Sequence, residues 1–387
     1  MSDKQPSSIP QELQLQFNNL FDIPLNDPLL SLLQTFIANS LHLSSKVELE
    51  DIELNQESWE QKVGEYAKQG LWRGLATFMK QQIATTDNSQ ILLLLKLWCY
   101  RLISLIKLNL CQLASAELDK LDNLFDKKYR FENQPELFPN RKGPMIPFVL
   151  LVIWAKLPGY LGDNLISIDR IYYLINYCRK VNKFNPEQIQ LWKNRIIQLS
   201  LILTNYLLKL KELILATTII EQLTLQSDCD FIIWNCCIRL YLYGGNIKEA
   251  EIKIKQYNRY ELIDNNYKLN LLLNNTLLLM SKAQWNDSIQ LIETYLDKNE
   301  NNFKLNNLLA INYLYIGNLN KSITILKQTI EQFTKENSPL LPAIILKNLS
   351  TSYELITIHH LKKKKQILDL IHPYLGDGYD IDAFKFN

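Results

Sequence analysis

The chain has 387 residues, of which 42 are basic and 40 are acidic, so its formal net charge is only +2. Such a balance gives no general attraction for nucleic acid or for an anionic membrane surface, and it excludes functions driven by net charge alone. Glycine (11 residues) and proline (13 residues) are scarce, and few segments alternate apolar with polar residues, which predicts an all-α protein.

The N-terminal part of the chain is expected to be irregular before it becomes helical. Residues 1–50 are rich in Ser, Pro, Asn and Gln around one apolar patch, and this composition favours a flexible segment with one short helix. Residues 51–136 contain a weak pattern of a break residue, an apolar residue and then a small residue, as at Gly70, Trp72 and Ala76. The pattern predicts degenerate helical pairs.

A proline-rich segment then interrupts the helical pattern. Residues 137–148 read LFPNRKGPMIPF, and proline disfavours helix at the residue that precedes it. We expect 137–147 to form a connector, with Pro147 at the start of the next helix. Two interpretations stay open: the connector only packs against its own chain, or it binds a partner. The candidate partner-binding residues are Arg141, Lys142, Gly143 and Met145.

We expect residues 148–196 to form one more degenerate helical repeat. After them the sequence repeats with a period of 34 residues. The separation is 34 residues from Ala216 to Ala250 and again from Ser288 to Ser322. From Ala250 to Ser288 it is 38 residues, so an insertion is expected around 259–265. A 34-residue period is typical of the tetratricopeptide repeat, a pair of helices. Region 197–336 thus holds four predicted repeats: 197–230, 231–264, 269–302 and 303–336.

Residues at matching positions of the predicted repeats have matching sizes. Small residues stand where two helices would approach most closely, and large aromatic residues stand where the space between helices must be filled. Break residues stand where first helices would end, and glycine is favoured there because it tolerates positive φ. The signature residues are Ala216, Trp234, Tyr241, Gly245, Ala250, Trp285, Ser288, Tyr313, Gly317 and Ser322. Further break residues are Asn109, Gly162, Lys211 and Ala283.

The end of the chain is expected to close the array. Residues 337–387 are predicted to be capping helices and a tail, because the last repeat would otherwise expose its apolar face. We interpret the run from Lys362 to Lys365 as a solvated helix face rather than a site for lipid head groups. The predicted fold is therefore a right-handed α-α superhelix with a C-terminal capping helix pair.

The sequence contains no motif for catalysis or for cofactor binding. Neither GxxxxGK[ST] nor GxGxxG occurs, and GxSxG and HExxH are also absent. The six cysteines form no Cys-x-x-Cys pair, which argues against a zinc site. No run approaches the roughly 18 uncharged apolar residues of a membrane span, and the start of the chain lacks a signal-peptide layout. We expect a cytoplasmic protein without enzymatic activity, metal or cofactor, although an enzyme's helical-repeat subunit stays an alternative.

Several segments occur in an order that is shared by a known family. LFPNRKGPMIPF (137–148) is similar to the pattern Y/F-P-x-R-x-G-x-M-x-P-F, and YLGDNLISIDRI (160–171) follows it. The repeat LLAINYLYIGNLNKSITIL (308–326), the segment LKNLSTSYEL (346–355) and the helix LKKKKQILDLI come later. From about Trp59 onward, the chain resembles the tetratricopeptide-repeat subunit family, the twelfth subunit, of the transport protein particle (TRAPP) tethering complex.

The resemblance implies a function and a set of partners. It implies a non-catalytic scaffold subunit of a TRAPP III-type complex, which tethers vesicles in traffic from endoplasmic reticulum to Golgi and in autophagy. Other subunits of that complex activate a Rab GTPase. The implied direct partners are TRAPP subunits, especially the large peripheral ones, at ER–Golgi and Golgi membranes, with only indirect or weak membrane contact. The alternative is a generic tetratricopeptide adaptor in another multiprotein complex.

Overall fold

The computed structural model shows a helical protein. The structure describes residues 14–24, 28–36, 59–184, 188–225, 231–257, 265–296, 302–336, 341–356 and 358–386. Within these ranges the regular elements are helices, and one isolated antiparallel bridge joins Arg130 to Pro144. The chain divides into two compact units, and in the described residues the boundaries between them fall within α1 (Pro28–Phe36), within α7 (Asn164–Phe184) and on either side of 376–378.

The first unit is built around a pair of long helices. In the described part of the chain it contains 14–24, 28–30, 59–170 and 376–378. Leu75 and Met79 of one central helix and Leu94 and Trp98 of the other are fully buried, and their spacing of four places each pair on one helix face. The helices of this unit, besides α7, are α2 (Trp59–Gln69), α3 (Trp72–Thr85), α4 (Ile91–Lys107), α5 (Cys111–Leu118), η2 (Asp119–Leu121), η3 (Lys127–Tyr129), η4 (Phe131–Asn133) and α6 (Phe148–Tyr160).

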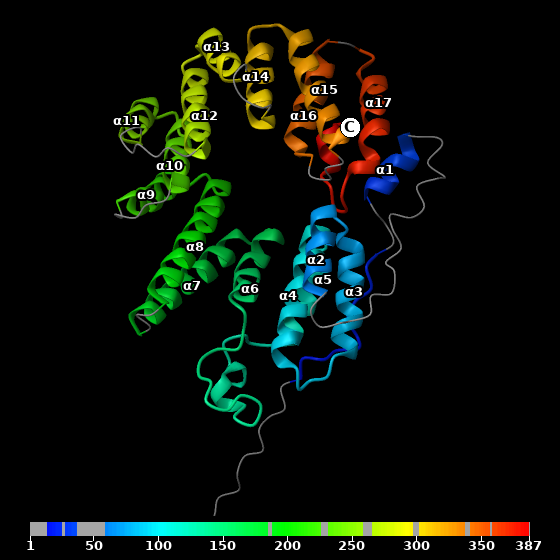
Figure 1. Ribbon diagram of the computed structural model, residues 1–387, viewed down its shortest axis with the longest axis vertical. Coiled ribbons are helices and arrows are strands. Elements are labelled where there is room, and N and C mark those ends of the chain that lie inside the picture. Colours follow the sequence, from blue (N-terminus) through cyan, green and yellow to red (C-terminus); the bar gives the residue numbers. More distant parts are fainter. Residues whose placement is uncertain are drawn as a thin grey trace, which may run out of the picture. The chain divides into compact units, whose positions relative to one another are not determined.

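The second unit is a succession of helix pairs (Figure 1). Its helices after α7 are α8 (Ile189–Lys209), α9 (Leu213–Thr224), α10 (Phe231–Tyr243), α11 (Ile247–Tyr257), α12 (Asn265–Ser281), α13 (Trp285–Leu296), α14 (Phe303–Tyr315), α15 (Leu319–Lys335), α16 (Ala343–Ile356), α17 (His360–Ile371), η6 (His372–Tyr374) and η7 (Ile381–Phe384). From α8 to α17 each helix contacts the next, and α10, α12, α14 and α16 also contact one another in turn. The predicted all-α solenoid is confirmed. The expected insertion at 259–265 lies almost entirely outside the described residues.

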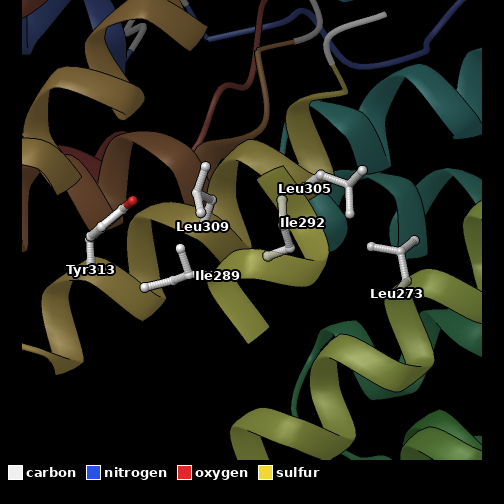
Figure 2. Packing of buried hydrophobic residues seen from close by; sticks show 6 residues of the cluster. All are labelled: Leu273, Ile289, Ile292, Leu305, Leu309 and Tyr313. Atoms are coloured by element: carbon white, nitrogen blue, oxygen red, sulfur yellow. The ribbon is translucent and has the colours of Figure 1, made fainter. Parts of the chain in front are cut away.

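Apolar clusters join each helix pair to the next. Figure 2 shows one cluster, in which α12, α13 and α14 contribute side chains that point toward one another. Its members are Leu273, Ile289, Ile292, Leu305, Leu309 and Tyr313. Three successive helices share this core, so a single helix pair could not bury its apolar surface without its neighbour. This dependence is the usual source of stability in repeat proteins.

One turn geometry recurs between the helices of both units. Its break residue has positive φ in every case: Gly70, Asn109, Gly162, Lys211, Gly245, Ala283 and Gly317. The residue after the break donates its N–H to a carbonyl five positions earlier, as Asn318 does to Tyr313 at 2.9 Å. This bond is the signature of the Schellman motif, which closes a helix at a left-handed residue. The break residues recognised in the sequence therefore all lie at positive-φ positions that end a helix.

Candidate partner-binding connector

The connector 137–147 and the residues 119–136 before it form an ordered loop between α5 and α6. Backbone hydrogen bonds hold this loop closed. Met145 donates its N–H to the carbonyl oxygen of Tyr129 at 2.8 Å, and Phe131 donates its N–H to the carbonyl oxygen of Gly143 at 3.0 Å. These bonds lie on either side of the isolated antiparallel bridge. These bonds thus attach the proline-rich segment to the residues that precede it. In Figure 1 the loop lies before α6 along the chain.

The inner side of this loop between α5 and α6 is buried. Tyr129 is 2 % exposed, and its O–H donates to the carbonyl oxygen of Leu121 at 2.6 Å. Burial raises the pKa of this tyrosine above its ordinary value. Met145 and Ile146 are 4 % and 6 % exposed, which places two apolar anchors directly before Pro147, the N-cap residue of α6. These anchors fix where the connector ends and where the helix begins.

The outer side is held by a carboxylate. Glu132 Oε1 accepts the N–H of Gly143 at 3.0 Å and lies 3.2 Å from Nη2 of Arg130. The hydrogen bond from Arg130 is the main reason why the pKa of Glu132 falls to about 2, and the bond from Gly143 acts in the same direction. Gly143 has φ +108°, a conformation that L side chains rarely adopt. A glycine is therefore required for the loop to reach the carboxylate.

Two cations lie at the exposed edge of the connector. Arg141 and Lys142 are both exposed, and the guanidinium carbon of Arg141 lies 5.9 Å from the ring centroid of Phe131. Phe131 in turn packs edge-on against Phe138, with ring centroids 5.1 Å apart. Aromatic contact restricts a long basic side chain that would otherwise lose conformational entropy on binding a partner. The arrangement is suited to an anionic group on another protein.

The structure brings the four predicted residues into one loop but gives them different roles. Arg141 and Lys142 present their side chains to solvent, whereas Gly143 acts through its backbone and Met145 is buried. Glu132, whose carboxylate organises the loop, was not among the residues predicted from the sequence. Nothing in its local sequence distinguishes it from other surface glutamates, because its partner Gly143 is eleven residues away.

Comparison with known proteins identifies sequences that are similar to this helical chain. No family model matches it. It is 26 % identical over 328 residues to "Trafficking protein particle complex subunit 12" of mouse and 27 % identical over 326 residues to the human protein of the same name. The chain is similar to TRAPP subunit 12 over most of its length. Each alignment covers 78 % of this chain, and the chain spans about two fifths of the length of these curated relatives, 39 % and 43 %.

In this chain, which is similar to TRAPP subunit 12, the small signature residues are all buried. Ala216, Ala250 and Ser288 are 0 % exposed and Ser322 is 1 % exposed. Ser288 Oγ also accepts a hydrogen bond from Nδ2 of Asn312 at 2.8 Å. A larger side chain at these positions would have to displace a neighbouring helix. Gly245 and Gly317 are the left-handed residues of their turns, as described above.

The aromatic signature residues differ in their surroundings. Trp234 is 9 % exposed and Tyr313 is 5 % exposed, but Trp285 is only half-buried and stacks on Tyr315, with ring centroids 4.5 Å apart. Tyr241 is also half-buried. Trp285, at the start of α13, thus contacts the end of α14 in the next helix pair instead of being enclosed within its own pair.

Two of the signature tyrosines form the same hydrogen bond across successive helix pairs. Tyr313 donates to Oε1 of Glu293 at 2.6 Å, and Tyr241 donates to Oε1 of Glu221. In both cases the glutamate lies 20 residues before the tyrosine, on the second helix of the preceding pair. Burial and the neighbouring carboxylate raise the pKa of Tyr313 and of Tyr241. The bond therefore repeats with the helical array.

The lysine run at the start of the cap is not one solvated face. Lys364 is 1 % exposed, and its Nζ donates to Oε1 of Glu354 and to the carbonyl oxygen of Lys385, both at 2.5 Å. The interpretation of the run as a solvated face was wrong for this residue, because a helix places neighbouring residues on different sides. Lys365 lies 5.3 Å from the ring centroid of Phe36. Part of the run therefore stabilises the cap.

Two further findings concern metals and membranes. Among the described residues, no three His, Cys, Asp or Glu side chains come together in a group that could hold a metal ion. None of the described helices combines the length and the apolar character needed to cross a membrane.

Proposed function

We propose that this chain is a non-catalytic scaffold subunit of a TRAPP III-type complex. The similarity to TRAPP subunit 12 of mouse and human over 78 % of the chain carries the proposal. The succession of helix pairs supports it, because stacked pairs form an extended surface on which segments of other proteins can bind. Its direct partners would be other TRAPP subunits, especially the large peripheral ones.

The connector supports a binding function on physical grounds. It is held by two backbone bonds and by the carboxylate of Glu132, so Arg141 and Lys142 need little ordering before they meet a partner. Arginine is well suited to this task, because its planar guanidinium can bind a carboxylate through two parallel hydrogen bonds. The partner surface would carry Asp or Glu side chains opposite the two cations. Met145 and Gly143 contribute by keeping the loop in its binding conformation.

The wider role follows from the same proposal. In the assembled complex, other subunits would activate a Rab GTPase, and the whole assembly would tether vesicles between endoplasmic reticulum and Golgi and act in autophagy. The chain would be cytoplasmic and peripheral at ER–Golgi and Golgi membranes, with its membrane contact made through its partners. It would need neither cofactor nor metal for this function.

Affinity purification tests the complex. The full-length chain is tagged in its native cells, and the co-purifying proteins are identified by mass spectrometry. We expect the small core and large peripheral TRAPP subunits in amounts comparable to the tagged chain. Recovery of another complex without TRAPP subunits would show that the chain is a generic tetratricopeptide adaptor and would overturn the proposal.

A charge reversal tests the connector in the same purification. The double variant Arg141→Glu/Lys142→Glu should reduce recovery of the directly bound subunit by about tenfold or more, because it places like charges opposite each other. The matched control is Lys335→Glu/Lys347→Glu, which makes the same change in net charge at two exposed positions outside the connector. Equal recovery with both variants would mean that the connector is not the binding site.

A further inference from the structure

Residues 14–24 pack against the helices of the first unit as an irregular segment, with neither helix nor strand. Near the start of this segment, Oδ1 of Asn88 accepts the N–H groups of Leu15 and Gln16 at 3.1 and 2.9 Å. The indole N–H of Trp98 donates to the carbonyl oxygen of Leu15 at 3.0 Å. Side chains of α4 and of the turn between α3 and α4 thus bind the backbone of the segment, as a peptide-binding protein does with its ligand.

A second set of contacts binds the backbone N–H and carbonyl groups of Phe21, farther along the segment. Arg101 and Glu117 form an ion pair in which both side chains are 0 % exposed, with 2.6 Å between Nη2 and Oε1. Nη2 of Arg101 donates to the carbonyl oxygen of Phe21 at 2.7 Å, and Phe21 donates its N–H to Oε1 of Glu117 at 3.1 Å. A buried ion pair is costly unless further hydrogen bonds satisfy its polar atoms. The bound segment supplies two of those bonds.

Three apolar side chains anchor the segment between the two polar contacts. Leu15 is 0 % exposed and Leu20 is 4 % exposed. Phe17 packs edge-on against Trp98, with ring centroids 5.8 Å apart. The spacing of the anchors is Leu-x-Phe-x-x-Leu. The backbone contacts would accept any residue at the x positions, whereas the buried anchors require apolar side chains, so the surface has a defined sequence preference.

Lysine and arginine side chains complete the binding surface along the segment. Nζ of Lys120 donates to the carbonyl oxygen of Asn19 at 2.6 Å, and Nη1 of Arg73 donates to the carbonyl oxygen of Pro24 at 2.7 Å. Nζ of Lys80 lies 2.6 Å from Oδ1 of Asp22. An acidic residue two positions after the last apolar anchor therefore adds to recognition, although this ion pair is largely exposed and worth little by itself.

We propose that α3, α4 and α5 form a binding site for an extended peptide of the pattern Leu-x-Phe-x-x-Leu. In the chain alone, residues 14–24 occupy the site, and a partner protein's segment of the same pattern takes their place in an assembly. The contacts to backbone atoms allow this exchange, because they are reproduced by any extended chain that carries the three anchors. The chain's own segment is tethered and therefore competes at a high effective concentration, so a partner peptide must bind tightly enough to displace it.

Peptide titration into the full-length chain tests the proposal. A fluorescein-labelled peptide of residues 14–24 is titrated, and its fluorescence anisotropy is measured. In the full-length variant Leu15→Asp/Leu20→Asp the tethered segment should leave the site, because an unpaired carboxylate is not buried in an apolar environment. We expect saturable binding to this variant and roughly hundredfold weaker binding to the unmodified chain, because the tethered segment competes at an effective concentration near a millimolar.

Two controls assign the binding to this site. A peptide that carries the same two aspartate substitutions should not bind to either protein. Adding Asn88→Ala to the vacated variant removes the acceptor of two backbone N–H groups and should weaken peptide binding about tenfold. The proposal is wrong if the wild-type peptide binds both proteins equally, or if it fails to bind a vacated variant whose helical circular dichroism is unchanged.

Hydrogen exchange of the unmodified chain shows whether residues 14–24 can leave the site, even when the variant does not fold. The amide protons of Leu15, Gln16 and Phe21 should exchange by release of the segment alone, roughly a hundredfold faster than amides in the middle of α4. Excess unlabelled peptide should accelerate their exchange further by occupying the vacated site. Exchange of these amides at the same rate as those of α4 would show that the segment is part of the core and would overturn the proposal.

Discussion

Asp377 donates its backbone N–H to the carbonyl oxygen of Gly70 at 2.8 Å. Its carboxylate accepts the N–H of Arg73, at 3.0 Å, in the first turn of α3. Residues 376–378 therefore satisfy backbone groups at the turn between α2 and α3 that would otherwise need water. The fit is close, because a Cβ atom on Gly70 would lie 2.9 Å from Cα of Gly376. Two stretches some 300 residues apart in sequence thus complete one turn.

Gly378→Ala should destabilise the fold much more than a matched glycine substitution. The new Cβ would lie 2.2 Å from the carbonyl oxygen of Lys107, a backbone atom that cannot move away easily. Gly245→Ala is the control, because Gly245 also has positive φ but an added Cβ there would have no neighbouring atom within 4 Å. We expect a loss of about 1 kcal/mol for the control and roughly 2–4 kcal/mol for Gly378→Ala in urea denaturation. Equal losses would contradict the close packing.

Ala283→Gly should stabilise the protein. Ala283 adopts φ 57° at a turn where the neighbouring repeats use Gly245 and Gly317, and a left-handed alanine is strained by about 1 kcal/mol. Removing the strain should raise the free energy of unfolding by about 0.5–1 kcal/mol. Ala116→Gly, within α5, should change it by a similar amount in the opposite direction. Thermal melts of both variants would reveal the opposite signs, and a loss in both would show that the turn is not strained.

Tyr313→Phe should weaken the contact between successive helix pairs by about 1 kcal/mol, because it removes the donor to Glu293 and leaves a partly buried carboxylate with fewer partners. Tyr315→Phe is the control, since Tyr315 is 62 % exposed. A double-mutant cycle with Glu293→Gln isolates the pairwise term. A coupling energy indistinguishable from zero would mean that the repeated hydrogen bond contributes nothing to stability.

Acid should open the connector before it unfolds the helices. The pKa of Glu132 is lowered to about 2 in the folded protein, below the roughly 4.3 of a free glutamate. A lowered pKa contributes stability that is present above the unfolded value and is lost as pH falls from there through about 2. Protection of the Gly143 amide from hydrogen exchange should therefore fall across this pH range. Glu132→Gln should make that protection independent of pH, and a pH profile in this variant that matches the unmodified chain would contradict the assignment.

The local features of the fold were predictable from the sequence. The break residues from Gly70 to Gly317 were recognised by spacing alone, because a Schellman turn depends on a few adjacent residues and on tolerance of positive φ. The small residues Ala216 and Ala250 were recognised for a similar reason, since a period of 34 residues identifies equivalent places in the stack. The prolines correctly indicated a break before α6.

The features that depend on distant partners were not predictable. Residues 14–24 lie within a segment whose composition suggested flexibility, but side chains such as Asn88 and Arg101 bind their backbone. Neither residue, one in the turn between α3 and α4 and the other in α4, belongs to a sequence pattern that predicts a bound segment. Likewise, the pairing of Phe131 with Gly143 joins residues that a linear reading separates. Lys364 appeared to be one of four equivalent lysines, and only the packing of the tail distinguishes it from its neighbours.

The three residues Gly376, Asp377 and Gly378 also constrain how the protein is made. They belong to the first unit although they follow α8 to α17 of the second unit in the chain. A ribosome produces them only after all of those helices, so the turn at Gly70 cannot be completed until nearly the whole chain has been synthesised. While those helices are being made, α2 and α3 therefore lack their last backbone partners.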